Sequence, residues 1–248
     1  MNDVIAVMDL RGGRCVAAVG GDRDQYRPVA RFDRHTIDGD PIALAKCFAA
    51  RGLSRVYVAD LDAIQSGQLQ RATLMRLASL WSTTTTLSEL WLDIGNPAAF
   101  AGVETIFDGL SVRWIHATET LQTVDTFRDS IAQVRGRWPR DSNAVSMDYR
   151  GSRFLGSDEP SWWDEIGVSR WPTIVLDLAK VGSDTGVDPQ SVAKRERVLG
   201  TDVTMVTGGG VRDSRDVAAL IDAGWHAVLV GTALQRLVPV LEPFDRNG

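Results

Sequence analysis

Short runs of apolar and β-branched residues alternate along the chain with longer amphipathic runs. The short runs predict strands at Val4–Met8, Arg55–Asp60, Leu90–Ile94, Val112–His116, Ala144–Asp148, Thr173–Asp177, Val203–Thr207 and Ala227–Val230. The longer runs predict helices at Pro41–Arg51, Arg71–Leu80, Leu121–Gly136, Ser161–Ile166, Pro189–Leu199 and Asp213–Ala223, with a weaker one near Pro97–Gly102. This alternation is typical of repeated βα units.

Eight strands in this order close most economically into a (β/α)8 barrel, an α/β fold for which 248 residues is an ordinary length. An open doubly wound sheet is the alternative. No linker or low-complexity segment divides the chain, so we expect one domain over residues 1–248. The polar tract at Ser82–Thr86 is interpreted as a loop.

The composition is that of an ordinary globular protein, with 44% apolar and 24% charged residues. A net charge of −5 with both signs interspersed argues against nucleic-acid binding. No apolar stretch approaches the length of a membrane span, and the amino terminus lacks the basic region of a secretory signal. We therefore expect a cytoplasmic protein. Cys15 and Cys47 do not form a disulfide framework, and we expect neither a metal nor a cofactor.

One motif near the start of the chain occurs again just past its middle. MDLRGGR at Met8–Arg14 matches MDYRGSR at Met147–Arg153, with Met, Asp, Arg, Gly and Arg at the same spacing. In the next predicted strand of each half, VYVADL resembles IVLDL, which pairs Asp60 with Asp177. A unit repeated at half-chain length points to two fused half-barrels.

The most specific motif is VTGGGVRDSRD at Val206–Asp216, where a strand ends, three glycines follow and a helix begins. Glycines let backbone N–H groups approach a ligand closely, and a helix start adds further donors. The eighth strand also ends on Gly231 and Thr232. The loops after strands seven and eight frequently hold phosphate in such barrels. The candidate phosphate-binding residues are Gly208, Gly209, Gly210, Gly231 and Thr232. The alternative is that both are tight turns that need glycine.

The matching turns of the first half differ. The third predicted strand leads into LDIGNPAAF, with one glycine where the seventh has three. The fourth ends in WIHATET, with His116 and Ala117 where the eighth has Gly231 and Thr232. Side chains replace bare backbone there, so the sequence predicts one phosphate site.

Asp9 and Asp148 end the first and fifth predicted strands, and we expect their side chains to enter the barrel mouth from opposite walls. A sugar isomerisation needs an acid that opens the ring and a base that moves a proton between C1 and C2. The alternative is that each aspartate caps its loop or pairs with Arg11 or Arg150.

Three further residues are candidate substrate contacts. Arg11 follows the first strand, and Asp177, like Asp60 and Asp62, ends a strand where it can hold substrate hydroxyls or a metal. Magnesium is compatible with carboxylates but is not indicated. Among the histidines, only His116 lies at the carboxyl end of a predicted strand. Its role there is either that of a proton shuttle or that of a structural hydrogen-bonding group.

The segments VIAVMDLRGGRCV, DPIALAKCFAARGLSRVYVADLDAI, VSMDYRG, TGGGVRDSRDV and AVLVGTAL together resemble the histidine-biosynthesis barrel family. That family contains phosphoribosylformimino-aminoimidazole carboxamide ribotide isomerase and the cyclase subunit of imidazole glycerol phosphate synthase. The resemblance covers nearly the whole chain. It implies two phosphate sites, one per half-barrel, and aspartates at the ends of strands one and five in both enzymes. Those aspartates fall on Asp9 and Asp148.

The chain departs from this family at several places. The glycine triplet of the amino half is replaced by Asp93–Asn96 and its partner glycine by His116, while an aspartate of the isomerase falls on Val181. Together with GDRDQYRPV at Gly21–Val29, these departures make the chain similar to a divergent isomerase-related branch. That branch occurs in methanogens and in bacteria with tetrahydromethanopterin-type C1 metabolism.

Three functions follow as hypotheses. The first is an isomerase of a ribosyl compound that bears one 5-phosphate, in the biosynthesis of a C1-carrier cofactor. The second is the histidine-pathway isomerase with a rebuilt second phosphate site. The third is a phosphosugar-binding protein without catalysis, which the Asp9 and Asp148 pair disfavours. In each case the partner is a small phosphorylated molecule, and the oligomeric state stays open.

Overall fold

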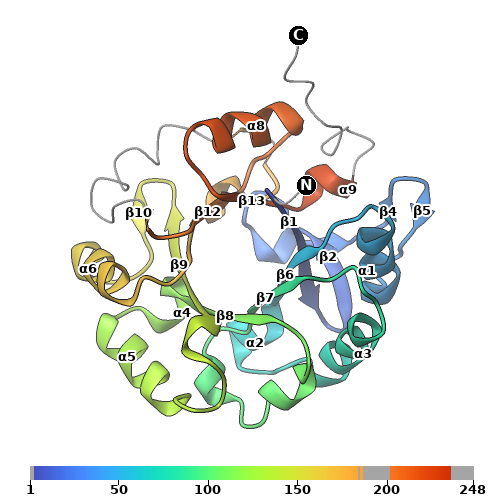
Figure 1. The fold of residues 1–248 in the computed structure, drawn as a ribbon. Coiled ribbons are helices and arrows are strands. Elements are labelled where there is room, and N and C mark those ends of the chain that lie inside the picture. Colours follow the sequence, from blue (N-terminus) through green and yellow to red (C-terminus); the bar gives the residue numbers. More distant parts are fainter. Residues whose placement is uncertain (1–2, 184, 187–201, 236–248) are drawn as a thin grey trace.

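The computed structural model describes residues 3–183, 185–186 and 202–235. Eight parallel strands form a ring, and the last one pairs with the first through the register Ile5↔Leu229. In order around the ring they are β1 (Val4–Arg11), β6 (Arg55–Asp60), β7 (Glu89–Asp93), β8 (Val112–Ala117), β9 (Asn143–Arg150), β11 (Thr173–Asp177), β12 (Met205–Gly208) and β13 (Ala227–Val230). Figure 1 looks down the axis of this ring, with helices arranged around it. The predicted (β/α)8 barrel is confirmed, and the open sheet is excluded because β1 and β13 pair.

Helices follow the strands much as the sequence predicts. The longer ones are α1 (Pro41–Ala50), α3 (Arg71–Ser82), α5 (Val124–Gln133), α6 (Glu159–Ser169) and α8 (Ser214–Asp222). Short helices are α2 (Leu61–Ser66), α4 (Thr118–Leu121) and α9 (Thr232–Gln235), with 3-10 turns at Arg23–Gln25, Pro97–Ala99, Glu104–Phe107, Arg140–Ser142 and Leu178–Lys180. The predicted helix Pro189–Leu199 lies outside the described residues.

Two predicted helices differ from the observed ones for local reasons. The run Leu121–Gly136 is split, because Gln122 adopts a positive φ of 56° and Thr123 then caps α5 in a reciprocal capping box with Thr126. The weak helix near Pro97–Gly102 is only a 3-10 turn, and Gly102, at φ 68°, is left-handed just beyond it.

Strand alternation divides the core into two layers. One set of strand residues fills the barrel interior, with Ile5, Ile115 and Leu229 among them. The opposite set packs against the helices, where Phe127 of α5 and Trp162 of α6 are almost fully buried. Each such side chain stabilises the fold by roughly 1.5–3 kcal/mol relative to exposure. The same alternation decides which residues at the strand ends face the barrel axis.

The repeated motif forms the same hairpin twice. Strand β2 (Arg14–Ala17) returns along β1 with Arg11 opposite Arg14, and β10 (Arg153–Phe154) returns along β9 with Arg150 opposite Arg153. The N–H of Gly12 donates to Asp62 at 2.8 Å, and the N–H of Gly151 donates to Asp177 at 2.9 Å. Each hairpin is thus held by an aspartate at or just beyond the end of the next barrel strand, although in the first half this is Asp62 and not Asp60, the residue that matches Asp177 in sequence.

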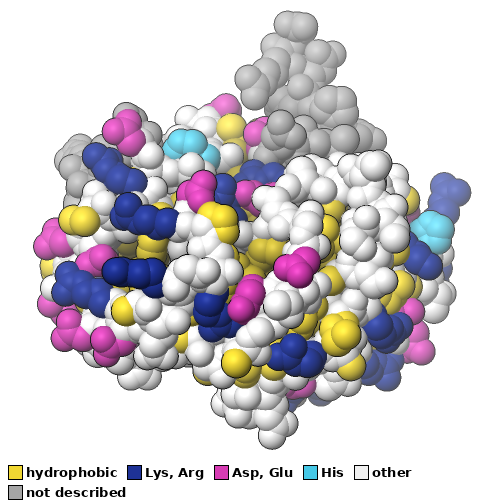
Figure 2. All heavy atoms as spheres, turned by 60° about the horizontal axis from the view of Figure 1, so that its bottom comes forward, with side chains coloured by type: hydrophobic (Ala, Val, Ile, Leu, Met, Phe, Trp, Pro, Cys, Tyr) yellow, Lys and Arg dark blue, Asp and Glu magenta, His cyan; other side chains and the backbone are white. Residues whose placement is uncertain are grey.

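The surface carries both charge signs. On the face in Figure 2, basic and acidic side chains lie interspersed. Three short strands complete the fold: β3 (Arg27–Pro28) pairs with β2, and β4 (Arg31–Phe32) pairs with β5 (His35–Thr36). Among the described residues, no helix has the length and apolar character needed to cross a membrane.

Candidate functional site

A cavity of about 1020 Å³, including the part open to solvent, lies at the carboxyl ends of the barrel strands. Every barrel strand, or the loop after it, contributes to its wall. The polar lining includes Asp9, Arg23, Tyr26, Tyr57, Asp93, Glu119, Asp148, Thr232 and Gln235, and the glycines are Gly21, Gly182, Gly209, Gly210 and Gly231. The aspartates and the glycine turns singled out in the sequence therefore line one cavity.

The glycine turn after β12 needs its glycines. Gly209 and Gly210 adopt φ values of 84° and 77°, a region that other residues rarely enter. A Cβ on Gly210 would also lie 3.1 Å from the carbonyl oxygen of Gly186, and the Gly186 N–H donates to the Gly210 carbonyl at 3.0 Å. Bare backbone thus faces the cavity at Gly209, Gly210 and Gly231.

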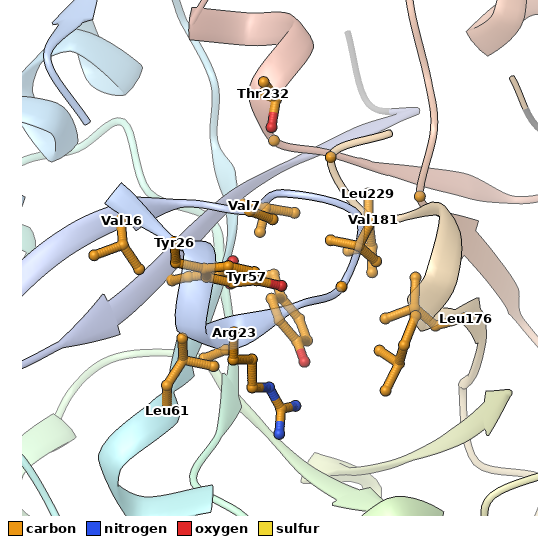
Figure 3. A pocket seen from close by; sticks show the side chains of 18 of the residues that line it. Val7, Val16, Arg23, Tyr26, Tyr57, Leu61, Leu176, Val181, Leu229 and Thr232 are labelled. Atoms are coloured by element: carbon orange, nitrogen blue, oxygen red, sulfur yellow. The ribbon is translucent and has the colours of Figure 1, made fainter. Parts of the chain in front are cut away.

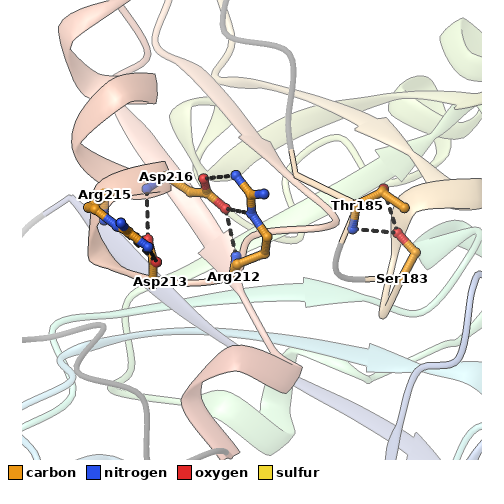
Figure 4. Close-up of polar contacts among 6 residues, drawn as sticks. All are labelled: Ser183, Thr185, Arg212, Asp213, Arg215 and Asp216. Carbon is orange, nitrogen blue, oxygen red and sulfur yellow. Dashed lines mark hydrogen bonds and ion pairs between the residues drawn. The ribbon is translucent and has the colours of Figure 1, made fainter.

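The start of α8 is occupied by its own side chains (Figure 4). The Asp213 carboxylate accepts from the N–H groups of Arg215 and Asp216, and the Asp216 carboxylate accepts from the backbone and side chain of Arg212. The expectation that this helix start supplies unpaired donors is therefore corrected. The backbone of the glycine turns is the part of this segment that reaches the cavity.

Four acidic side chains line the cavity. Asp9, Asp93 and Asp148 lie on β1, β7 and β9 at positions that alternate with the outward-facing ones, and Glu119 follows β8 in α4. Asp148 is 3% exposed and accepts from the Ser146 hydroxyl at 2.7 Å. It also accepts from the Glu119 N–H at 3.2 Å. Asp93 is 4% exposed.

Tyr57 and Gly95 hold the Asp93 carboxylate. The Tyr57 hydroxyl donates to Asp93 Oδ2 at 2.9 Å, and the Gly95 N–H donates to Oδ1 at 2.9 Å. Burial raises the pKa of Asp93 to about 6, against these two hydrogen bonds.

Burial also raises the pKa of the two predicted catalytic aspartates. The pKa of Asp9 rises to about 7 mainly through desolvation, while the nearby Arg23 guanidinium opposes the rise. The pKa of Asp148 is raised by desolvation and by the negative charges of Glu119 and Asp93, and the Ser146 hydrogen bond opposes this. Both groups can thus exchange protons near neutral pH.

Arg23 is the only basic side chain among the described residues that line the cavity. It comes from the loop between β2 and β3, and its guanidinium donates to Glu119 Oε1 at 2.5 Å. The same loop is fixed on its other side, where the Gly21 N–H donates to the Val181 carbonyl at 3.0 Å. Figure 3 shows Arg23 and Thr232 at opposite ends of the cavity, with Tyr26 and Tyr57 between them.

Residues 3–237 match the family described as Histidine biosynthesis protein. The chain belongs to this family. Its similarity to an uncharacterized protein of Methanocaldococcus jannaschii is 27% identity over 245 residues, 96% of each chain.

Two further relatives share a name, 1-(5-phosphoribosyl)-5-((5-phosphoribosylamino)methylideneamino) imidazole-4-carboxamide isomerase. The one from Acetivibrio thermocellus is 27% identical over 248 residues, 93% of each chain. The one from Natronomonas pharaonis is 26% identical over 250 residues, 94% of this chain and 92% of its own.

In this histidine biosynthesis family member, four of the expected contacts lie away from the cavity. Asp177 faces outward and uses its Oδ1 to hold the N–H groups of Gly151 and Ala179. The Arg11 guanidinium donates to the Arg23 carbonyl and lies 3.7 Å from Asp24, so it does not pair with Asp9. Gly208 ends β12 beneath the cavity, where a Cβ would meet Leu229.

His116 is the fourth of these. It is fully buried in the layer between barrel and helices, beside the Phe127 ring, and its Nε2 lies 2.9 Å from Asn143 Oδ1. Desolvation lowers its pKa to about 4, so it is neutral at pH 7. The expectation of a substrate contact is corrected, because Ile115 and Ala117, not His116, face the barrel axis.

Asp93, Glu119 and Arg23 are the charged cavity residues that the sequence reasoning missed. The sequence did hold a signal for Asp93. Glu89, Trp91 and Asp93 are spaced by two residues along one strand, so they share a face, and Trp91 faces inward. Arg23 carried no local signal, since its place depends on how the loop folds back over the barrel. Among the described residues, no group of three or more His, Cys, Asp or Glu side chains is arranged to hold a metal.

Proposed function

We propose that the protein is an aldose–ketose isomerase for a ribosyl compound that bears one phosphate. The observation that carries this proposal is the presence of Asp9, Asp148 and the glycine turns around one cavity. The phosphate binds the backbone at Gly209, Gly210, Gly231 and Thr232, which leaves the ribose between the two aspartates. The family and the isomerase names of its relatives support this reaction class.

The surroundings of the two aspartates suggest their roles. Asp148 lies beside negative charges that keep it protonated, so it donates a proton to the ring oxygen as the bond from that oxygen to C1 breaks. Asp9 lies beside Arg23, which favours its carboxylate, so it removes the proton from C2. Protonation at C1 and loss of the C2 hydroxyl proton then give the ketose.

The second candidate is the imidazole-4-carboxamide isomerase reaction named for two of the relatives. The names favour it, and its substrate carries two phosphoribosyl groups. The acidic side chains of Asp93 and Glu119 stand against it, because they occupy the cavity wall opposite the glycine turns and repel a second phosphate.

We also place the chain in the divergent branch of the family that occurs in methanogens and in bacteria with tetrahydromethanopterin-type C1 metabolism. This placement rests on the departures from the family pattern at Asp93–Asn96, His116 and Val181 and on the segment Gly21–Val29. The reaction then serves the biosynthesis of a C1-carrier cofactor, in the cytoplasm and on a small phosphorylated substrate.

Proton exchange tests the proposal. The protein is incubated in D2O with a ribosylamine 5-phosphate, and the product is followed by NMR. We expect deuterium at C1 of a ketose for the wild-type protein and none for Asp9→Asn. Gly209→Asp raises KM sharply, because a like charge and a Cβ enter the phosphate cradle. Turnover of a bisphosphorylated ribotide alone, with no exchange in any monophosphorylated compound, would instead establish the second candidate.

A further inference from the structure

The two ends of the cavity have opposite chemistry. The turns after β12 and β13 present glycine backbone at Gly209, Gly210 and Gly231. In the related half-barrel, the equivalent strands β7 and β8 lead to Asp93 and Glu119. The repeat of the fold therefore places two carboxylates across the cavity from the glycine turns.

The carboxylates at this end retain capacity to accept hydrogen bonds. Asp93 takes one donor on each oxygen, from Tyr57 and Gly95, and Glu119 Oε1 takes the guanidinium of Arg23. A carboxylate offers about four acceptor positions, so further donors fit around both groups. A ligand atom that contacts Asp93 or Glu119 directly must therefore donate hydrogen bonds rather than accept them.

The chain itself shows what this end binds. The Arg23 guanidinium, a planar cation with several N–H donors, is held there by Glu119 at 2.5 Å. The lining has one basic side chain and four acidic ones, so acidic groups outnumber basic ones around the cavity. Between the two ends, Leu176, Val181 and Leu229 form an apolar wall on one side of the cavity (Figure 3).

We propose that the substrate carries, at the end opposite its phosphate, a nitrogen group that donates hydrogen bonds to Asp93 and Glu119. An amine or an amino-substituted ring has this chemistry, and the apolar wall accommodates the ring. The orientation rests on the proposed function, which puts the phosphate at the glycine turns. Asp93 and Glu119 are then the residues that select this substrate over one with a second anionic group.

A pair of stable probes tests this selection without turnover. Both are 1-amino-1-deoxyribitol 5-phosphates with a phenyl ring on the nitrogen, one bearing an aminomethyl group and the other a carboxylate. Calorimetric titration of the full-length protein gives Kd for each. We expect the aminomethyl probe to bind about 10- to 100-fold more tightly, which is the range of one charge-assisted hydrogen bond.

The variants locate the effect. Asp93→Asn and Glu119→Gln keep the side-chain shapes and should reduce the preference to about threefold or less. Asp24→Asn is the matched control, because it removes a negative charge from the Arg23 loop outside the cavity lining and should keep the full preference. Equal binding of the two probes by the wild-type protein, tighter binding of the carboxylate probe, or no binding of either overturns the inference.

The proposed function is judged separately. Deuterium exchange with a plain ribosylamine 5-phosphate does not need a group at the acidic end. If exchange occurs while the probes bind equally, the isomerase proposal stands and the acidic end selects nothing. If the aminomethyl probe is preferred while no exchange occurs, the selection stands and the reaction is wrong.

Discussion

Asp9 and Asp148 have matching positions in the two half-barrels but different surroundings. Asp148 is buried among hydroxyl and N–H donors next to acidic neighbours, whereas Asp9 is less completely covered and lies near Arg23. Two carboxyl groups whose environments differ in this way can take different roles in one proton transfer. The difference arises from the residues around them, since the repeated motif itself is the same.

Replacing either aspartate with asparagine should remove turnover and preserve ligand binding. Loss of a general acid or base typically reduces the rate by about 10²–10⁴-fold. Phosphate binding should survive because the backbone N–H groups of the turns after β12 and β13 are the same in both variants. Turnover and ligand titration on Asp9→Asn and Asp148→Asn measure this. Wild-type rates in both variants would mean that the two residues are structural.

The raised pKa of Asp9 makes a prediction about stability. Between pH 4 and pH 7 the folded protein holds the Asp9 proton more tightly than the unfolded chain does, so this group costs stability as the pH rises through that window. Asp9→Asn lacks this cost. At pH 8 it should be more stable than wild type by about 1–2 kcal/mol, or roughly 2–8 °C in Tm, after allowance for solvent screening.

Thermal unfolding of both proteins at pH 4 and pH 8 measures this difference. At pH 4 Asp9 is protonated in the folded protein and only partly ionised in the unfolded chain, so the stabilities of wild type and Asp9→Asn should differ little. If the difference in Tm between wild type and Asp9→Asn is the same at both pH values, the pKa of Asp9 is not raised in the folded protein.

At the scale of elements, the loop between β2 and β3 closes one side of the cavity. Backbone meets backbone where Gly21 packs on Leu178, and a Cβ on Gly21 would overlap the Leu178 carbonyl. Gly182 packs in the same manner on Ala18. Through this contact and the Arg23–Glu119 ion pair, the loop connects the walls that follow β8 and β11.

Gly21→Ala should loosen this loop more than Gly20→Ala. Both glycines have positive φ, 68° and 55°, but a Cβ on Gly20 meets no atom within 4 Å. The pair therefore separates steric overlap from backbone strain. We expect Gly21→Ala to lose about 1–3 kcal/mol more of the free energy of unfolding, as overpacked sites do, and to raise KM. Urea unfolding measures the first effect, and equal losses in the two variants would contradict the packing.

At the scale of the whole molecule, the two half-barrels differ at the cavity: β12 and β13 lead into turns of bare glycine backbone, whereas β7 and β8 lead to Asp93 and Glu119. A second phosphate cradle supplies several charge-assisted hydrogen bonds of about 1.5–3 kcal/mol each. Losing three of them reduces affinity by roughly a thousandfold or more. We therefore expect weak or absent rescue of a strain that lacks the histidine-pathway isomerase, with a genuine isomerase gene as positive control. Full rescue at ordinary expression would favour the second candidate function.

The sequence by itself determined the order of strands and helices, the barrel, and the residues at the ends of β1, β9, β12 and β13. These follow from local causes: apolar periodicity marks strands and helices, and glycine triplets mark turns with positive φ. The helix boundaries that the sequence did not predict also have local causes. One is the positive φ of Gln122, which the apolar periodicity does not reveal.

Only the tertiary structure decided which of these residues share the cavity. Asp177 and His116 end strands as Asp9 and Asp148 do, yet face outward, because side chains alternate and the register of the closed sheet fixes the inward set. The same alternation brought Asp93 to the cavity, and α4 added Glu119. Arg23 entered because a glycine contact with a loop from the other half-barrel folded its own loop over the mouth. Such placements depend on contacts between residues distant in sequence, which no local pattern records.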